Sequence, residues 1–193
     1  MSKKRVPNKW FWVSLLMPLL VLTSMLYKPV STMIHGTEIT LATIPIDPRD
    51  LFYGDYVILD LEIEEIDVSL IDPTIKKKLE GYEYNRQLSV FVSLARGENG
   101  VYRAEYVSEQ KPDGIYIKGS MSPYIEDNSW NEGANFKEYV RVEYGIERFY
   151  VEEGTGLELE DQAREGQVLV SVKIQNGYPV LTDIIGIESI NQQ

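Results

Sequence analysis

A chain of 193 residues, 44% hydrophobic and 25% charged, is long enough for one folded domain with a short appendage; this composition excludes a disordered chain and a multi-span membrane protein. Beyond Lys28 the sequence carries 14 basic and 30 acidic residues, which gives this part a formal charge of −16; the basic N-terminus brings the whole chain to −11. We therefore expect no nucleic-acid partner. The absence of cysteine excludes a disulfide framework, a thiolate zinc site and a cysteine nucleophile.

The first predicted element is a membrane-spanning helix. Residues 10–27 read WFWVSLLMPLLVLTSMLY without a charge, and about 17 to 25 apolar residues cross a bilayer as a helix. Four basic residues precede this run and only Lys28 closely follows it, so the positive-inside bias places residues 1–9 in the cytoplasm. A cleaved signal peptide is the alternative, but its apolar region is shorter and ends in a small-residue cleavage site. We therefore expect a retained anchor.

Residues 28–36 read as a short tether, and residues 37–193 as one extracytoplasmic domain. Its first predicted strand, residues 38–46, ends at an Asp-Pro pair. The second, residues 56–66, is the cleanest in the sequence, because apolar and acidic residues alternate along it. Its apolar face consists of Leu59, Leu61 and Ile63.

The middle of the chain predicts one short helix and a set of antiparallel strands. Asp72 is a suitable N-cap for a helix that stops at Gly81. Residues 87–95 and 101–108 flank the turn sequence RGENG and predict a hairpin, and residues 115–121 continue the same sheet. Residues 122–137, rich in Asn, Gly and Pro, predict a long loop.

The last part of the chain predicts a bent strand, a second short helix and a hairpin. Residues 139–150 return to strand with a bend or bulge at Gly145, and residues 157–164 can form two helical turns. Residues 168–174 and 180–187 flank Asn-Gly, the strongest short hairpin signal. Many short strands with one or two short helices predict an α+β domain, mainly antiparallel sheet, behind one N-terminal transmembrane helix.

Few residues in this chain can support catalysis. The only histidine, His35, lies just past the apolar run, and neither a nucleophile elbow, a P-loop nor a dinucleotide fingerprint occurs. Acidic residues are abundant instead, in two clusters that alternatively suit Ca²⁺ binding or carboxylate-dependent hydrolysis. We expect solvated surface and no cofactor at both clusters. They contain Asp47, Asp50 and Asp55, and Glu152, Glu153, Glu158, Glu160 and Asp161.

The segment DPRDLFYGDYVILDL resembles the family named for its GDYxxLxY motif. Gly54, Asp55, Tyr56 and Leu59 match the motif directly, whereas Leu61 stands where the final Tyr should be. The segment EYGIERFYVEEGTGLELE, residues 143–160, resembles a second family block. The resemblance implies a bacterial, membrane-anchored protein and supplies no catalytic residues.

The two motif-bearing segments, residues 47–55 and 144–160, are predicted to meet in space as a candidate site or a structural brace. The residues concerned are Arg49, Asp50, Gly54, Asp55, Tyr56, Tyr150, Glu153 and Glu160. The function hypothesis is an accessory or interaction module of the cytoplasmic membrane, with a single pass through residues 10–27 and membrane or envelope proteins as partners. The alternative is a carboxylate-dependent cell-envelope hydrolase or a cation-binding domain.

Overall fold

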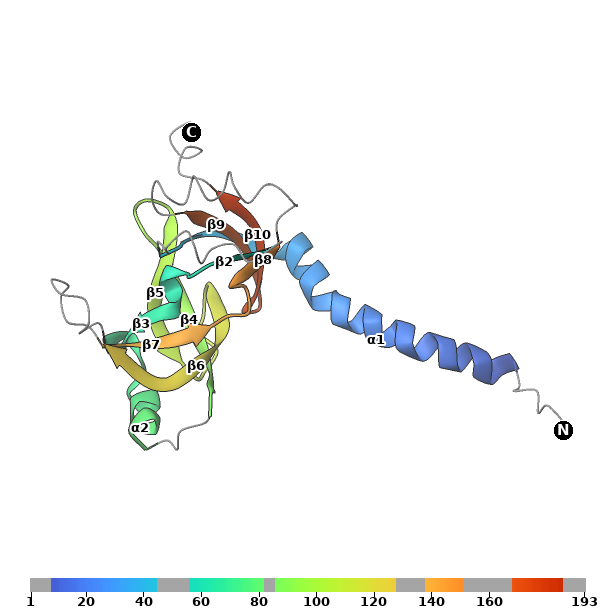
Figure 1. The fold of residues 1–193 in the computed structure, drawn as a ribbon, viewed down its shortest axis with the longest axis horizontal. Helices are drawn as coiled ribbons and strands as arrows, with labels where there is room; N and C mark the ends of the chain where they lie inside the picture. The colour runs from blue at the N-terminus through green and yellow to red at the C-terminus, as the bar shows by residue number, and fades with distance from the viewer. Residues whose placement is uncertain (1–7, 45–55, 82–85, 128–137, 151–167, 186–193) are drawn as a thin grey trace.

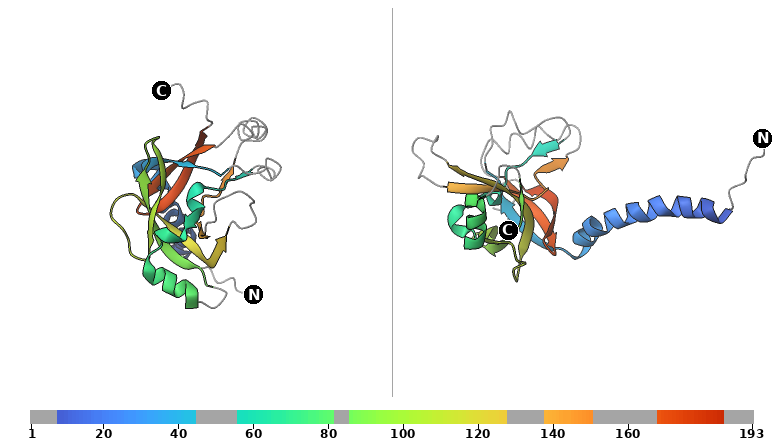
Figure 2. Two further views of the ribbon diagram at one scale, coloured as in Figure 1. Left: turned by 90° about the vertical axis from the view of Figure 1, so that its left-hand side faces the viewer. Right: turned by 90° about the horizontal axis from the view of Figure 1, so that it is seen from below.

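The computed structural model describes residues 8–44, 56–81, 86–127, 138–150 and 168–185 (Figure 1). A long helix extends away from a folded domain, which is built on a curled sheet (Figures 1 and 2). The domain is α+β, as the sequence predicted. The acidic segments at 47–55 and 152–161, and the helix predicted at 157–164, lie outside the described residues.

The long helix is α1 (Asn8–His35), which is long and apolar enough to span a membrane. Its apolar side chains are exposed from Trp10 to Leu26, because no part of the domain covers them. The helix is longer than the apolar run, since it continues through Pro29 to His35, where the sequence predicted a tether. The additional turns are stabilised by contacts with the domain, which the sequence pattern does not reveal.

Eight strands form one curled, mixed sheet in the order β10-β9-β1-β5-β4-β6-β7-β3. Only the β1–β5 pair is parallel; the other neighbours in this sheet are antiparallel. The helix α2 (Pro73–Gly81) and the two-stranded ribbon of β2 (Tyr56–Ile58) and β8 (Arg148–Tyr150) complete the described domain. The sheet strands are β1 (Thr37–Ala42), β3 (Glu65–Asp67), β4 (Leu88–Arg96), β5 (Val101–Ser108), β6 (Tyr116–Asp127), β7 (Glu138–Glu143), β9 (Leu169–Gln175) and β10 (Tyr178–Ile185).

The predicted hairpins are confirmed. The β4–β5 pair forms around the RGENG turn, and the β9–β10 pair forms around Asn176 and Gly177. Both turn residues have positive φ, 51° and 75°, as a type I′ turn requires. The Gly177 carbonyl accepts a hydrogen bond from the Lys118 amide at 2.9 Å, so the turn rests against β6 and contributes to the curl of the sheet.

The prediction of one strand over residues 56–66 is wrong. The chain forms β2, then a 3₁₀ turn (Glu62–Glu64), then β3. The three apolar residues of the predicted face are buried as expected, but Glu64 is buried too, at 3% exposure. Its carboxylate accepts a hydrogen bond from the Leu61 amide at 2.8 Å, which stabilises a turn that alternation cannot predict.

The prediction of a loop over residues 122–137 is wrong for its first part. Strand β6 continues through Pro123 to Asp127 and pairs with β7, with Ile125 opposite Val140 and Glu126 opposite Tyr139. The register shifts between Met121 and Ile125, and this irregularity lets a proline lie within the strand without breaking the pairing. Residues 128–137 lie outside the described part.

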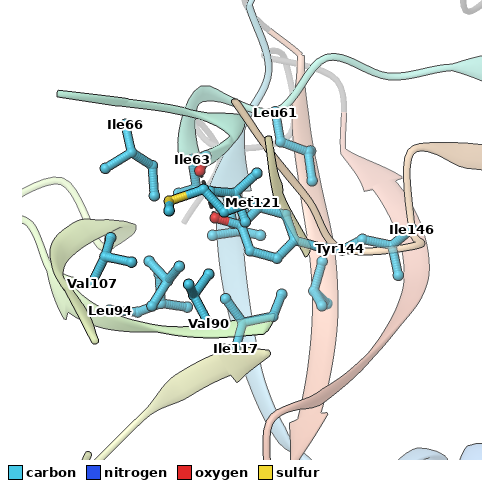
Figure 3. Close-up of a cluster of buried hydrophobic side chains, with 14 of the residues drawn as sticks. Leu61, Ile63, Ile66, Val90, Leu94, Val107, Ile117, Met121, Tyr144 and Ile146 are labelled. Atoms are coloured by element: carbon cyan, nitrogen blue, oxygen red, sulfur yellow. Dashed lines mark hydrogen bonds between the residues drawn. The ribbon is translucent and has the colours of Figure 1, made fainter. Parts of the chain in front are cut away.

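The core fills the inner face of the curled sheet (Figure 3). Side chains from β4, β5 and β6 meet the residues that connect β2 to β3, and Leu61, Ile63 and Met121 are completely or almost completely buried. The segment before Leu61 also contacts the chain just after β1, because Ile44 donates an amide hydrogen bond to the Asp60 carbonyl at 2.7 Å. Residues 59–66 thus cover the inside of the sheet between β1 and β7.

Candidate functional site

The ribbon of β2 and β8 brings together the two sequence blocks that carry the family resemblance. Tyr56 lies opposite Tyr150, and Ile58 lies opposite Arg148, in antiparallel register. The Leu59 amide extends the pairing by donating to the Glu147 carbonyl at 2.9 Å. The strand directly after the 47–55 segment and the first part of the 144–160 segment are therefore neighbours.

Most residues of the predicted composite site lie outside the described part of the chain. These are Arg49, Asp50, Gly54, Asp55, Glu153 and Glu160. Tyr56 begins β2, and the side chain of Tyr150 on β8 is 74% exposed. A direct contact between the two acidic segments through Arg49 stays a prediction.

Behind the ribbon lies a polar group of side chains that the sequence analysis did not single out. We call it the carboxylate cluster and define it as Asp60, Glu64, Arg141, Tyr144 and Glu147. Arg141 on β7 is its cation: one guanidinium nitrogen lies 3.7 Å from Asp60 and 3.9 Å from Glu64, and another lies 3.3 Å from neighbouring Glu65. One guanidinium thus serves three carboxylates.

Glu64 is the most perturbed acid in the described part of the cluster. Burial disfavours its charged form and raises its pKa from 4.5 to about 7. The negative charges of Glu147 and Asp60 raise this pKa further. The Leu61 amide and the Arg141 guanidinium lower it, but burial is the largest effect. Glu64 therefore titrates close to neutral pH inside the fold.

Tyr144 and Glu147 fix the backbone on the other side of the cluster. The buried Tyr144 hydroxyl donates to the Ile63 carbonyl at 2.6 Å (Figure 3), and burial raises the pKa of this phenol well above its usual value. The Glu147 carboxylate accepts from the amides of Tyr144 and Gly145, the latter at 2.8 Å. Gly145 has φ 79°, so this carboxylate closes the predicted bend between β7 and β8.

The geometry gives the cluster a bracing role in the fold. The backbone amides of Leu61, Tyr144 and Gly145 bind its carboxylates, and Glu64 is buried. Within the described ranges, no three His, Asp or Glu side chains gather as metal ligands would. A sequence signal existed only for the bend at Gly145; the burial of Glu64 depends on tertiary contacts.

Comparison with known proteins gives one family assignment. The model of the family described as GDYXXLXY protein matches residues 18–184, which include the second half of α1, both strands of the ribbon and the β9–β10 hairpin. No curated protein and no solved structure matches the chain significantly. Because the match covers most of the sequence and includes both resembling blocks, the chain belongs to the GDYXXLXY family.

Proposed function

We propose that this protein is a single-pass protein of the bacterial cytoplasmic membrane, and that its acidic domain lies outside the cell membrane as an interaction or accessory module. The observation that carries the proposal is the direct, packed connection between the exposed apolar helix and the sheet. Five residues, defined as the helix–sheet joint, make this connection: Ser31, Thr32, Gly36, Lys173 and Gln175.

The helix–sheet joint leaves little freedom between anchor and domain. The Ser31 hydroxyl donates to the Gln175 side-chain oxygen at 2.7 Å, and Thr32 is only 1% exposed. The Gly36 amide closes the helix end on the Thr32 carbonyl at 2.8 Å. The Lys173 ammonium donates to the Met33 carbonyl at 3.0 Å. A domain fixed in this way is presented to membrane neighbours in one orientation, which suits an accessory protein better than a freely tethered enzyme.

The β2–β8 ribbon is the surface on which we expect partner contacts. It lies at one side of the domain (Figure 2), and within the described part of the chain it pairs with no third strand. The side chains of Ile58 and Tyr150 are exposed there. Exposed apolar and aromatic side chains favour recognition of another polypeptide.

Site-specific photo-crosslinking in membranes tests this function. A photoreactive residue at Tyr150 should give one reproducible covalent adduct with a membrane or envelope protein. The matched control is the same residue at exposed Lys77 on α2, which should give no such adduct. Equal crosslinking patterns at both positions, or no adduct at Tyr150 in membranes from the native host, would contradict the proposal.

Carboxylate-dependent hydrolysis is the second candidate, and the observation that favours it is the pKa of Glu64 near 7, beside Asp60 and Glu147. The burial of Glu64 and its hydrogen bond from Leu61 oppose this role. Incubating the purified full-length protein with cell-wall glycan distinguishes the two functions. Turnover that disappears in Glu64→Gln would establish the hydrolase and displace the accessory role.

A further inference from the structure

A hollow of about 550 Å³ lies where the last turns of α1 meet the β9–β10 hairpin. One wall is the helix, with Tyr27, Lys28 and Ser31, and the other is the hairpin turn around Asn176. Lys118 on β6 completes it. The hollow is open to solvent; Tyr144 of the carboxylate cluster and the adjacent Gly145 also line it, but none of the clustered carboxylates does.

The charge of this hollow is opposite to that of the domain. Its lining contains Lys28 and Lys118 and no Asp or Glu, although the sequence beyond Lys28 has a formal charge of −16. Both lysine side chains are exposed. Two cations without a nearby carboxylate in the lining favour an anionic ligand. An anion therefore fits the charge of this lining better than a cation does.

The hollow also offers neutral hydrogen-bond donors. Because the Gln175 side-chain oxygen accepts from Ser31, the amide nitrogen of the same side chain retains two N–H donors. Asn176 adds a second side-chain amide to the lining. The carbonyls at the end of a helix repel anions, but those of Thr32 and Met33 already accept from Gly36 and Lys173. The repulsion between these carbonyls and a bound anion is therefore reduced.

The position of the hollow along α1 identifies the source of the anion. Residues 10–27 of this helix rise about 27 Å, close to the roughly 30 Å thickness of a bilayer hydrocarbon core. If this run spans the core, Tyr27 and Lys28 lie at the level of the lipid headgroups. Tyr27 and Tyr178 are both exposed at the hollow, as amphipathic aromatic residues are at membrane interfaces.

We propose that this hollow binds the phosphate-bearing headgroup of an anionic phospholipid in the leaflet that faces the domain. Lys28 and Lys118 bind the phosphate, and the amides of Gln175 and Asn176 hold its oxygens or the glycerol hydroxyls. The attraction of these two lysines for the lipid phosphate offsets part of the repulsion between an acidic domain and an anionic membrane surface. This inference rests on the proposed insertion of α1 into the membrane.

Native mass spectrometry of the detergent-solubilised full-length protein tests the site with phosphatidylglycerol and phosphatidylcholine as probes. We expect tighter binding of phosphatidylglycerol than of phosphatidylcholine. The affinity for phosphatidylglycerol should be about 25-fold lower in the double variant Lys28→Gln/Lys118→Gln, since each of two basic residues near a membrane surface contributes about fivefold. The matched control, Lys76→Gln/Lys77→Gln on α2, removes the same charge and should bind phosphatidylglycerol like the wild type.

Two further arms separate the outcomes. Retained phosphatidylglycerol preference in the Lys28→Gln/Lys118→Gln variant, or an equal loss in the control, would overturn the site. Soluble glycerol phosphate binding as tightly as the lipid would overturn the lipid assignment. Resistance of the liposome-reconstituted protein to carbonate extraction reports insertion alone. Failure of the lipid site with intact insertion is therefore distinguishable from failure of the anchor.

Discussion

The helix–sheet joint and the carboxylate cluster are both polar regions within the fold, but they hold their parts together with different chemistry. The joint uses hydroxyl, amide and carbonyl groups with one lysine, whereas the cluster sets one guanidinium among several carboxylates. No buried side-chain nitrogen or oxygen in the described part lacks a hydrogen-bond partner. The carboxylate cluster, more than the attachment of α1 to the sheet, should therefore determine how stability depends on pH near neutrality.

The largest expected effect is the pH dependence of the cluster. Because folding raises the pKa of Glu64 from 4.5 to about 7, the folded state binds more protons than the unfolded state between these values. The contribution to stability is fully present below about pH 4.5 and is lost as the pH rises through 7. Between pH 8 and pH 4.5, the free energy of unfolding should gain up to about 3 kcal/mol from this residue.

Glu64→Gln is the control that isolates this contribution. The variant cannot ionise, so it should be more stable than the wild type at pH 8 and should match it near pH 4.5. Thermal unfolding of both full-length proteins in detergent, followed by near-ultraviolet circular dichroism, gives the difference between the two curves. A difference that does not change with pH would show that Glu64 is not neutral in the fold near pH 7.

At the joint, Gly36→Ala should cost about 2 kcal/mol of unfolding free energy. A Cβ atom at this position would collide with the backbone carbonyl oxygen of Thr32 and lie 3.1 Å from the Lys173 Cβ, so the helix end must shift from the sheet. Thermal unfolding should give the same loss of unfolding free energy for Gly36→Ala, relative to the wild type, at pH 5 and at pH 8. Thr37→Ala, at the next and exposed position, is the matched control and should change little.

Tyr144→Phe should lower the free energy of unfolding by less, about 1 kcal/mol. The ring remains packed in the core, but the Ile63 carbonyl loses the buried hydroxyl that donates to it at 2.6 Å. Urea unfolding at pH 7 measures the change. Tyr106→Phe, which removes an exposed hydroxyl bound to Asp72, should have a weaker effect. Equal losses of unfolding free energy in both variants would mean that the buried hydrogen bond contributes no more to stability than the exposed one.

The smallest effect should come from Ser31→Ala, about 0.5 to 1 kcal/mol, because one neutral hydrogen bond to Gln175 is lost in a partly buried setting. The more informative measurement for this variant is the distance between α1 and the sheet. Distances from spin labels on α1 to labels on β5 should broaden in Ser31→Ala relative to the wild type. An unchanged distribution would assign the rigidity of the joint to Thr32 and Gly36 instead.

The sequence predicts local features that adjoin the two regions, but not the long-range contacts within them. The Asn176-Gly177 turn was predictable because positive φ at both positions has a local chemical signature. The buried face of Leu59, Leu61 and Ile63 was predictable from alternation. The burial of Glu64 was not, because its place beside Arg141 depends on β7, which lies far away in sequence.

The joint was missed for a related reason. Residues 28–36 begin with Lys-Pro, which locally favours the end of a helix. Their helical turns are held by Gln175 and Lys173, about 140 residues further along the chain. Local composition cannot report such contacts. The predicted composite site is a different case, since most of its residues lie outside the described part of the chain.

Membrane topology is the central claim, and single-cysteine labelling tests it most directly, because the natural chain contains no cysteine. Ser2→Cys and Lys77→Cys place one thiol at the N-terminus and one on the exposed surface of α2. A membrane-impermeant maleimide should label Lys77→Cys in intact bacterial spheroplasts and Ser2→Cys only after detergent is added. Labelling of Ser2→Cys in intact spheroplasts, with Lys77→Cys protected, would contradict the account.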